Sequence, residues 1–405
     1  MSLNLTQFGG AFKDVYHEGS DVFKEQQNIH APFLDKIKTA AEKPSPDGIF
    51  TPTVMQFDFS GGAQNEDGTF DEYVGDLPIK PKIVSKLLTY YFEVTGSTIR
   101  LSKTDKQAFG RAMDRVMKNR YAVAFYDMER QWMGTGTGQI SLANGSGSAA
   151  TSLIVDDPTG FRVGMYIESF ATLGGSKEIG VSNACRITAI NLSTNTLTIT
   201  PAQTWSDNSI ICKKGKLDGV TSLANAKEMM GIQGMVDVST YSTTFESVDT
   251  TTYAQFTGNV VSAGTAPISH DFLQRVHNRV AIVSNSEPNM LLSNYGQARN
   301  FLNTELQKTR YEPGEVKAGA TVLKWGKYEW MINNNCAQGV VFFLNMDEVS
   351  KYQTDALKLA DLPNYSLFQV QNKDAVGGYL VYQGNGGTWA RNRHGKGTDL
   401  TEPTY

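Results

Sequence analysis

The chain has 405 residues, of which 40% are hydrophobic and 19% charged, and this length and composition allow two or three domains with a large core. Its net charge of -4 at pH 7 argues against a protein that binds nucleic acid over a wide surface, because such a surface needs clustered Lys and Arg. The amino terminus lacks an apolar signal core and no apolar run is long enough to span a bilayer, so we expect no membrane partner.

Residues 1–50 are predicted to form an N-terminal arm, because the segment contains few apolar anchors. The run Pro44–Gly48 is typical of a connector that is rigid at first and then loose. A short helix is expected over 31–42, with Pro32 near its first turn. A disordered tail is the alternative for this segment.

Residues 51–98 are predicted to form an extended acidic loop carried on two strands. Apolar residues alternate with other residues in both strands, at Met55, Phe57 and Phe59 in the first and at Leu88, Tyr90, Phe92 and Val94 in the second. The stretch between them is too long for a tight turn and too polar to build a core. A compact domain rarely keeps such a loop without a function, so we expect it to reach outside its own subunit.

Residues 99–139 are predicted to contain one long spine helix that ends at Gly134. Thr104 and Gln107 have the spacing of a capping box. An apolar stripe, expected to be buried within the subunit, recurs at three- and four-residue steps: Phe109, Met113, Val116, Met117, Tyr121, Ala124, Phe125, Met128 and Trp132.

Residues 140–216 are predicted to form a small inserted β domain. Glycine-rich runs flank the segment, and the clearest hairpin pairs 186–190 with 196–200. Residues 217–268 have a looser pattern and are assigned to the rest of the domain that contains the spine.

Residues 269–387 are predicted to form a mixed α/β domain, followed by a C-terminal return over 388–405. Ser269 and Asn294 are each placed to cap a helix. Strands are expected over 290–292, 321–325, 328–332, 339–344 and 379–382.

The order of these parts resembles the major capsid protein of tailed phages, which has the HK97-like fold. Three segments add to the resemblance: 288–293 is similar to the family's strand that enters the axial domain, 340–345 to its late β segment, and 378–382 with 391–395 to its closing strand and return. The resemblance implies an α+β chain with an N-terminal arm, extended loop, long spine helix and axial domain. The segment 140–216 is similar to extra β domains that such proteins carry.

A member of this family self-assembles into the pentamers and hexamers of an icosahedral head that encloses double-stranded DNA. The resemblance therefore implies further copies of the chain, a portal, a possible cement protein and DNA held without sequence specificity as partners. The N-terminal arm is too short to contain a fused scaffolding region, so a separate scaffolding protein is expected. The location implied is the virion, after assembly in the cytoplasm of a bacterial host.

Two alternatives remain open. An encapsulin-like nanocompartment shell shares the fold, and a carbohydrate-processing enzyme with a β module belongs to another class. The adjacent carboxylates of the loop lack the burial that would raise one pKa, so a solvated or intersubunit role is favoured over a hydrolytic pair.

No cofactor, metal or catalytic residue is predicted. Gly134, Gly136 and Gly138 follow a helix instead of opening one, which favours a linker over a phosphate-binding loop. His270 and His277 lie seven residues apart, a spacing more typical of solvated helix histidines than of metal ligands. Three cysteines, an odd number, indicate reduced thiols.

The candidate functional residues are charged groups for contacts between subunits. The loop carries a negative tip, with Lys80, Lys82 and Lys86 at its base. The tip is expected to meet a basic surface on a neighbour, either the polar face of the spine or a cluster near the C-terminus. The acidic group is Glu66, Asp67, Asp71, Glu72 and Asp76, and the basic group is Arg111, Arg115, Lys118, Arg391 and Arg393.

Overall fold

The computed structural model describes residues 32–45, 47–50, 53–57, 60, 62–63, 66, 68–69, 72, 75–97, 106–217, 226–241, 243–308, 323–360 and 368–403. The side chains of 106–115 are not among the described ones. The predicted capping box at Thr104 and the first 31 residues of the predicted arm lie outside the described residues. The chain divides into two compact units, Met1–Lys36 with Lys86–Glu129 and Gln353–Gly384, and Ile37–Ser85 with Arg130–Tyr352 and Asn385–Tyr405.

In the first unit, a long antiparallel strand pair lies beside the spine helix. Strand β6 (Lys86–Thr95) pairs with β22 (Ala375–Thr388) from Thr95↔Ala375 to Lys86↔Gly384. Strand β21 (Phe368–Gln369) pairs with the other side of β22, which also neighbours β20 (Val349–Leu359). The predicted alternation of β6 is confirmed, because Leu88, Tyr90, Phe92 and Val94 are all buried. Its predicted role as the return strand of the loop is wrong, since its partner is β22.

The spine helix, α4, runs over Lys106–Met133 and ends directly before Gly134, as predicted. Ala124, Met128 and Trp132 lie four residues apart on one face and are buried. Phe125, in contrast, is 44% exposed, so its predicted burial is wrong. Successive residues of a helix are about 100° apart, and at this point of the helix Ala124 faces the interior while its neighbours Val123 and Phe125 are exposed.

The N-terminal helix is shorter than predicted. Helix α2 covers Pro32–Lys36 only, and its first amides are held by the spine, because the Glu129 carboxylate accepts hydrogen bonds from the backbone N–H of Phe33 at 3.0 Å and of Leu34 at 3.1 Å. The segment after it is extended, and in the second unit β1 (Lys38–Thr39) pairs in parallel with Ser350 and Lys351 of β20.

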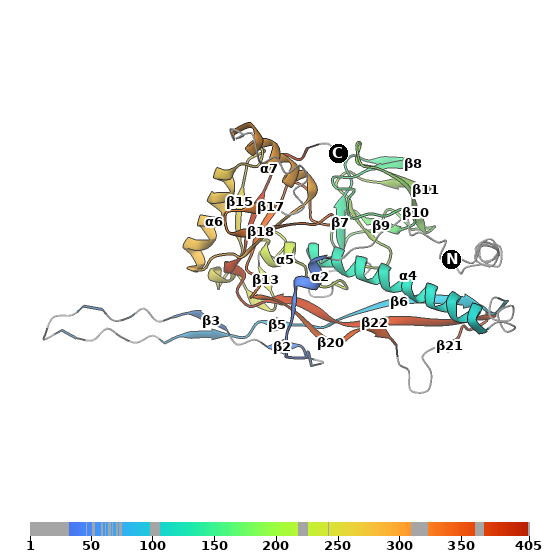
Figure 1. Cartoon of the computed structure of the whole chain (residues 1–405), viewed down its shortest axis with the longest axis horizontal. Helices are drawn as coiled ribbons and strands as arrows, with labels where there is room; N and C mark the ends of the chain where they lie inside the picture. The colour runs from blue at the N-terminus through green and yellow to red at the C-terminus, as the bar shows by residue number, and fades with distance from the viewer. Residues whose placement is uncertain are drawn as a thin grey trace, which may run out of the picture. The chain divides into compact units, whose positions relative to one another are not determined.

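The second unit contains a two-stranded extension between β2 and β5 (Figure 1). It is called the arm below and is distinct from the predicted N-terminal arm over 1–50. Strand β2 (Ile49–Phe50) pairs with β5 (Lys82–Ile83), and β3 (Thr53–Gln56) pairs with β4 (Leu77–Ile79), both antiparallel. The loop is therefore closed by its own second half and not by β6. Ile49 and Ile83 are buried with Tyr352 at the base of the arm.

The segment after the spine is a six-stranded antiparallel sheet with the order β7-β12-β9-β10-β11-β8. A bridge between Ala143 and Val155 joins the ends of the outer strands, so one end of the sheet closes as in a barrel. The predicted hairpin is confirmed by the pairing of Arg186 with Thr200. The strands are β7 (Gln139–Leu142), β8 (Gly147–Ile154), β9 (Tyr166–Phe170), β10 (Cys185–Asn191), β11 (Thr196–Trp205) and β12 (Ile210–Lys213).

A second six-stranded sheet has the order β15-β23-β19-β16-β18-β17. It includes strands from outside the predicted range 269–387, because β15 (Asn259–Ser262) precedes that range and β23 (Gly395–Thr398) follows it. The strand predicted over 379–382 in this domain is part of β22. It pairs with β6 in the first unit instead. The other strands are β16 (Met290–Ser293), β17 (Leu323–Trp325), β18 (Tyr328–Ile332) and β19 (Val341–Leu344).

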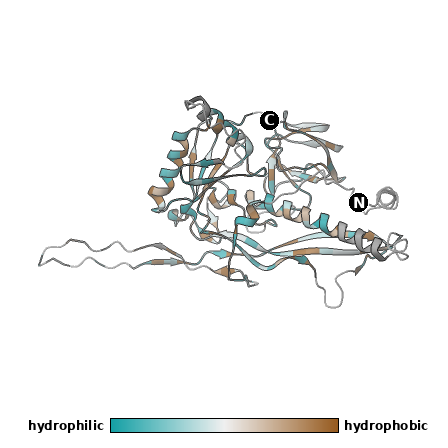
Figure 2. Cartoon of the chain, viewed as in Figure 1, coloured by the Kyte–Doolittle hydropathy of each residue, from teal (hydrophilic) through white to brown (hydrophobic). Residues whose placement is uncertain are grey.

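Two helices accompany this sheet, and both predicted caps are confirmed. The Ser269 hydroxyl accepts the Phe272 amide at the start of α6 (His270–Ser284) at 3.2 Å. Asn294 Oδ1 accepts the Gln297 amide at 2.9 Å at the start of α7 (Tyr295–Lys308). Both hydrophobic and hydrophilic residues occur along α6 (Figure 2), and Phe272, Leu273 and Val276 of this helix pack into the buried core of the sheet.

Short elements connect these parts of the second unit. They are α5 (Ile232–Val236), the hairpin strands β13 (Thr244–Phe245) and β14 (Val248–Asp249), and the 3-10 helices η3 (Ala254–Phe256) and η4 (Arg391–Arg393).

Candidate intersubunit surfaces

The arm carries large apolar side chains that are exposed at the surface of the described part of the chain. Phe50 is 51% exposed, Phe57 60% and Leu77 40%. A two-stranded ribbon is marginally stable by itself in water, and it gains stability when its faces or edges meet another surface. The arm therefore has the character of a segment that is completed by contact with another chain.

The acidic residues of the arm that the structure describes are exposed. Glu66, Glu72 and Asp76 all lie at the surface, as does Lys80. Lys82 lies nearer the base, with its Nζ atom 5.5 Å from the centre of the Phe50 ring. Asp67 and Asp71 lie outside the described residues. The structure thus places three of the five predicted acidic residues on the surface of the arm.

The predicted receiving residues divide into three groups. Lys118 is exposed on α4, whereas Arg111 and Arg115 lie on the same helix with side chains outside the described ones. Arg393 forms an ion pair with Glu348, and its side chain keeps 43% exposure. These four residues remain candidates for a contact between subunits.

Arg391 is not available for such a contact, which corrects the prediction from the sequence. It is fully buried, and its guanidinium donates hydrogen bonds to three backbone carbonyls: Nε to Met235 at 2.8 Å, one terminal nitrogen to Phe256 at 3.2 Å and the other to Asp237 at 2.5 Å. The guanidinium also lies 4.0 Å from the centre of the Phe245 ring. Arg391 therefore ties segments of its own subunit together.

A second exposed apolar surface, which the sequence reasoning missed, lies at the α6–α7 region. Ile282 is 81% exposed and Tyr295 57%. Arg275 and Arg279 are also exposed on α6, at the helical spacing that places them on the same face as Ile282. A signal for this surface is present in the sequence. Ile282 is apolar but does not lie at the helical spacing of the buried residues Phe272, Val276 and Val280.

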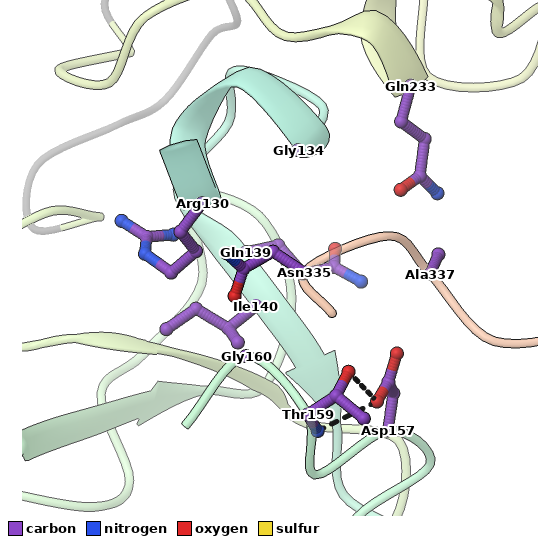
Figure 3. Close-up of a pocket in the computed structure, with 10 residues that line it drawn as sticks. All are labelled: Arg130, Gly134, Gln139, Ile140, Asp157, Thr159, Gly160, Gln233, Asn335 and Ala337. Carbon is purple, nitrogen blue, oxygen red and sulfur yellow. Dashed lines mark hydrogen bonds between the residues drawn. The ribbon is translucent and has the colours of Figure 1, made fainter. Parts of the chain in front are cut away.

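A pocket of about 50 Å³ lies where the C-terminal end of α4, the start of β7 and the loop after β18 meet (Figure 3). Asp157 is its only carboxylate and accepts hydrogen bonds from the Thr159 hydroxyl at 2.6 Å and the Gln338 amide at 3.2 Å. Burial raises the pKa of Asp157. Hydrolysis of a glycosidic bond uses two carboxyl groups, so this pocket does not have the residues of a glycosidase.

The two helix histidines reach solvent, because His270 is exposed and His277 is partly buried, and each also contacts an aromatic residue. The Trp325 indole N–H donates to His270 Nδ1 at 2.9 Å, and His277 Nε2 lies 2.7 Å from the Tyr328 hydroxyl. All three cysteines are free and buried, and burial raises the pKa of Cys185 to about 11 and of Cys212 to about 12.

Within the described part of the chain, no group of three His, Cys, Asp or Glu side chains could hold a metal ion. Among the helices of that part, none combines the length and the apolar character needed to cross a membrane.

Comparison with known proteins identifies the fold. No family model matches the chain, and no curated protein matches it. The capsid asymmetric unit of cyanophage A-1(L) aligns with a TM-score of 0.59 at 8% identity, over 95% of this chain and 96% of that chain.

Two other solved structures align with lower scores. The holo-SrpI encapsulin complex from Synechococcus elongatus PCC 7942 has a TM-score of 0.49 at 8% identity, over 97% of this chain and 98% of that chain. The capsid of a native GTA particle has a TM-score of 0.48 at 10% identity, over 95% and 97%.

The alignment with the cyanophage subunit extends over nearly all of both chains. The predicted α+β fold class is confirmed, and the chain has the HK97-like fold of a phage capsid subunit.

Proposed function

We propose that this chain is the major capsid protein of a tailed phage, which self-assembles into the pentamers and hexamers of an icosahedral head. The observation that carries the proposal is the shared fold with the capsid asymmetric unit of cyanophage A-1(L) over 95% of the chain. The activity of such a protein is assembly and not catalysis.

The arm supplies a physical reason for assembly. Its exposed apolar residues become stabilising when a second copy covers them. Each contact is weak, but a shell repeats it in every subunit, and a subunit held by several neighbours at once is held by avidity.

The charges of the arm would select the contact. We infer that the acidic tip meets the basic face of a neighbour's spine, which includes Arg111, Arg115 and Lys118, or the exposed Arg393. An exposed ion pair contributes about 0–1 kcal/mol, so these charges orient subunits more than they hold them together.

The partners that follow from this function are other copies of the chain, a separate scaffolding protein, a portal and possible cement proteins. The enclosed cargo is double-stranded DNA, held without sequence specificity. A net charge of -4 suits a container whose contents must be packed and later released. The place of function is the virion, after assembly in the cytoplasm of the bacterial host.

Electron microscopy and size-exclusion chromatography of the purified chain test the proposal. We expect closed particles at high protein concentration, with single capsomers or monomers at low concentration. A chain that stays monomeric at every concentration and salt condition, with and without its scaffolding protein, would contradict it. The cargo of particles isolated from infected cells separates a phage head, which holds DNA, from a nanocompartment, which holds protein.

Two matched substitutions test the role of the arm. Phe57 and Val181 are similarly exposed, at 60% and 64%, but Phe57 lies on the arm and Val181 on the inserted β domain. Phe57→Ser should prevent particle formation without lowering the melting temperature of the monomer. Val181→Ser should leave both unchanged. Equal assembly of the two variants would show that the apolar surface of the arm is not an assembly contact.

A further inference from the structure

The turn between β13 and β14 has a strained backbone. Glu246 and Ser247 form its two central residues, and both have positive φ, 48° and 66°. This is the geometry of a type I′ turn, which favours Asn-Gly because a larger side chain in the left-handed region costs about 1 kcal/mol. Strain of this kind persists where the surrounding structure requires it, and it often marks a functional position.

The side chain of Glu246 enters the interior. Both carboxyl oxygens are buried, and neither accepts a hydrogen bond of full geometry. The Thr388 amide interacts with the carboxyl group, but its effect on the pKa is smaller than that of burial. Buried polar groups are satisfied in the great majority of native proteins, because an unpaired one costs about 1–3 kcal/mol and an unpaired charge costs more. A buried carboxyl group with so little hydrogen bonding is therefore a position at which the neutral, protonated form is strongly favoured.

The carboxyl group lies at the base of the arm. A Cβ atom on Gly387 would be 3.2 Å from Glu246 Oε1 and would overlap Ile83 Cδ1, so the Glu246 carboxyl group and the buried side chain of Ile83 on β5 both lie against the same side of Gly387. The carbonyl oxygen of Glu246 also accepts the Lys82 amide at 2.7 Å. The same residue thus supplies a hydrogen bond to the arm and a titratable group beneath it.

Arg391, the cation that acts on the Glu246 carboxyl group, does not neutralise it through a hydrogen bond. Arg391 directs its guanidinium to the carbonyls of Met235, Phe256 and Asp237. Burial raises the pKa of Glu246 to about 8, against the smaller lowering effects of Arg391 and the Thr388 amide.

Other titratable groups surround this position on the elements packed against it. On β20, burial and Glu246 both raise the pKa of Tyr352, with smaller effects of Glu42 and Glu348. Tyr241 and Asp237 interact with Arg391. The Lys82 ammonium is directed to the Phe50 ring. None of these groups has a hydrogen bond to the Glu246 carboxyl oxygens.

We propose that Glu246 is a proton-controlled latch for the base of the arm. With Glu246 neutral, the turn stays closed on β5. When the proton is lost, the carboxylate gains by moving into water, and its departure breaks the hydrogen bond between the Lys82 amide and the Glu246 carbonyl. The local opening does not depend on the proposed function. A use of this opening in assembly rests on the proposed function.

The direction of the pH dependence follows from linkage. The pKa of Glu246 in the closed state, about 8, lies above its ordinary value of 4.5. The closed state therefore binds more protons than the open one. The latch is tightest below pH 4.5, loosens between pH 4.5 and about 8, and changes no further above that range.

Hydrogen exchange of the Lys82 amide, measured on the unassembled full chain, tests the latch. After correction for the intrinsic exchange rate, protection should fall by roughly tenfold per pH unit between pH 5 and pH 7.5. Glu246→Gln, which keeps a neutral side chain, should make the profile flat. Glu66→Gln, at an exposed position of the arm, should follow the wild type.

An amide in the same molecule serves as an internal control. The Asn289 amide donates to the Leu344 carbonyl in the second sheet, far along the chain from the arm, and its protection should not follow the slope of Lys82. A flat wild-type profile at Lys82, or equal slopes at Lys82 and Asn289, would overturn the proposal even if Glu246→Gln does not fold. A flat profile in a chain that still assembles would reject the latch and leave the proposed function intact.

Discussion

Arg130 and Glu228 form a buried, two-pronged ion pair at the C-terminal end of the spine helix. The two guanidinium nitrogens of Arg130 donate to the two carboxylate oxygens of Glu228, at 2.5 Å and 3.2 Å. The side chains are only 5% and 4% exposed. The pair fixes the segment before α5 to the end of the spine.

Removal of one partner from this pair should destabilise the protein strongly. We expect Glu228→Ala to lower the free energy of unfolding by about 3–5 kcal/mol, because it leaves the Arg130 charge buried without its partner. Urea denaturation measures the change. The exposed pair of Asp355 with Lys358 is the control, and Asp355→Ala should cost no more than about 1 kcal/mol. Similar losses in the two variants would mean that the Arg130–Glu228 pair is solvated in solution.

Two aromatic residues of the spine, Trp132 and Phe125, should respond differently to truncation. Trp132 is fully buried and Phe125 is 44% exposed. Trp132→Ala should therefore cost about 3–5 kcal/mol and Phe125→Ala about 1 kcal/mol or less. Thermal melts of the monomers compare them. A larger loss of stability for Phe125→Ala than for Trp132→Ala would mean that the buried face of the helix is the face that carries Phe125.

His394 should make the protein less stable in acid. Burial, with smaller effects of Arg391 and Arg393, lowers the pKa of His394 to about 3, below its ordinary value of 6.5. The folded state binds fewer protons, so this contribution to stability is complete above pH 6.5 and is lost as the pH falls toward 3.

The measurement for His394 is the difference between the wild type and His394→Gln. The variant can keep the bonds to the Thr388 hydroxyl and the Asn345 amide while removing the titration. Urea denaturation at pH 7, 5 and 4 should show the wild type losing up to about 1.4 kcal/mol per pH unit relative to the variant. A constant difference across this range would contradict the prediction.

The inserted β domain should be removable. Gln139 and Cys212 are paired neighbours on β7 and β12, so a short Gly/Ser bridge can replace residues 140–211. The buried hydrophobic cluster of the inserted domain shares no residue with the buried hydrophobic cluster of the second sheet. We expect the shortened chain, with Leu217→Ser to replace an apolar residue that loses its partners, to keep a cooperative melt. Complete loss of folded protein would mean that the domain is part of the main core.

Reversal of the acidic tip should block assembly and leave the monomer intact. In a variant that combines Glu66→Lys, Asp67→Lys, Asp71→Lys and Glu72→Lys, the two changed residues that the structure describes, Glu66 and Glu72, are exposed, so the melting temperature should stay nearly constant. Particle formation should fail, and moderate salt should weaken assembly of the wild type in the same direction. The neutral variant with Gln and Asn at these positions should be intermediate. Normal assembly of the reversed variant at low salt would leave the loop as a merely solvated segment.

The sequence predicted local features well, because local features have local causes. The alternation over 88–94 identified the buried face of β6, and Ser269 and Asn294 identified the starts of two helices. Alternation does not identify the partner of a strand, and the partner of β6 lies roughly 280 residues further along the chain.

The burial of Arg391 could not be found in the same way. In the sequence it stands in the run Arg391–His394, which has the pattern of a basic surface patch. Its burial depends on carbonyl groups at 235, 237 and 256, which only the tertiary fold brings together. The same holds for Glu246, whose neighbours come from β5 and the end of β22.

The burial of all three cysteines has a practical consequence. Cys185, Cys212 and Cys336 are each 0% exposed, and burial raises the pKa of every one of these thiols, so few thiolates form at neutral pH. The native chain should therefore react slowly with maleimides. A single cysteine introduced at position 57 or 181 would be the one fast-reacting thiol, and a fluorophore attached there could report when the arm of one subunit is covered by another.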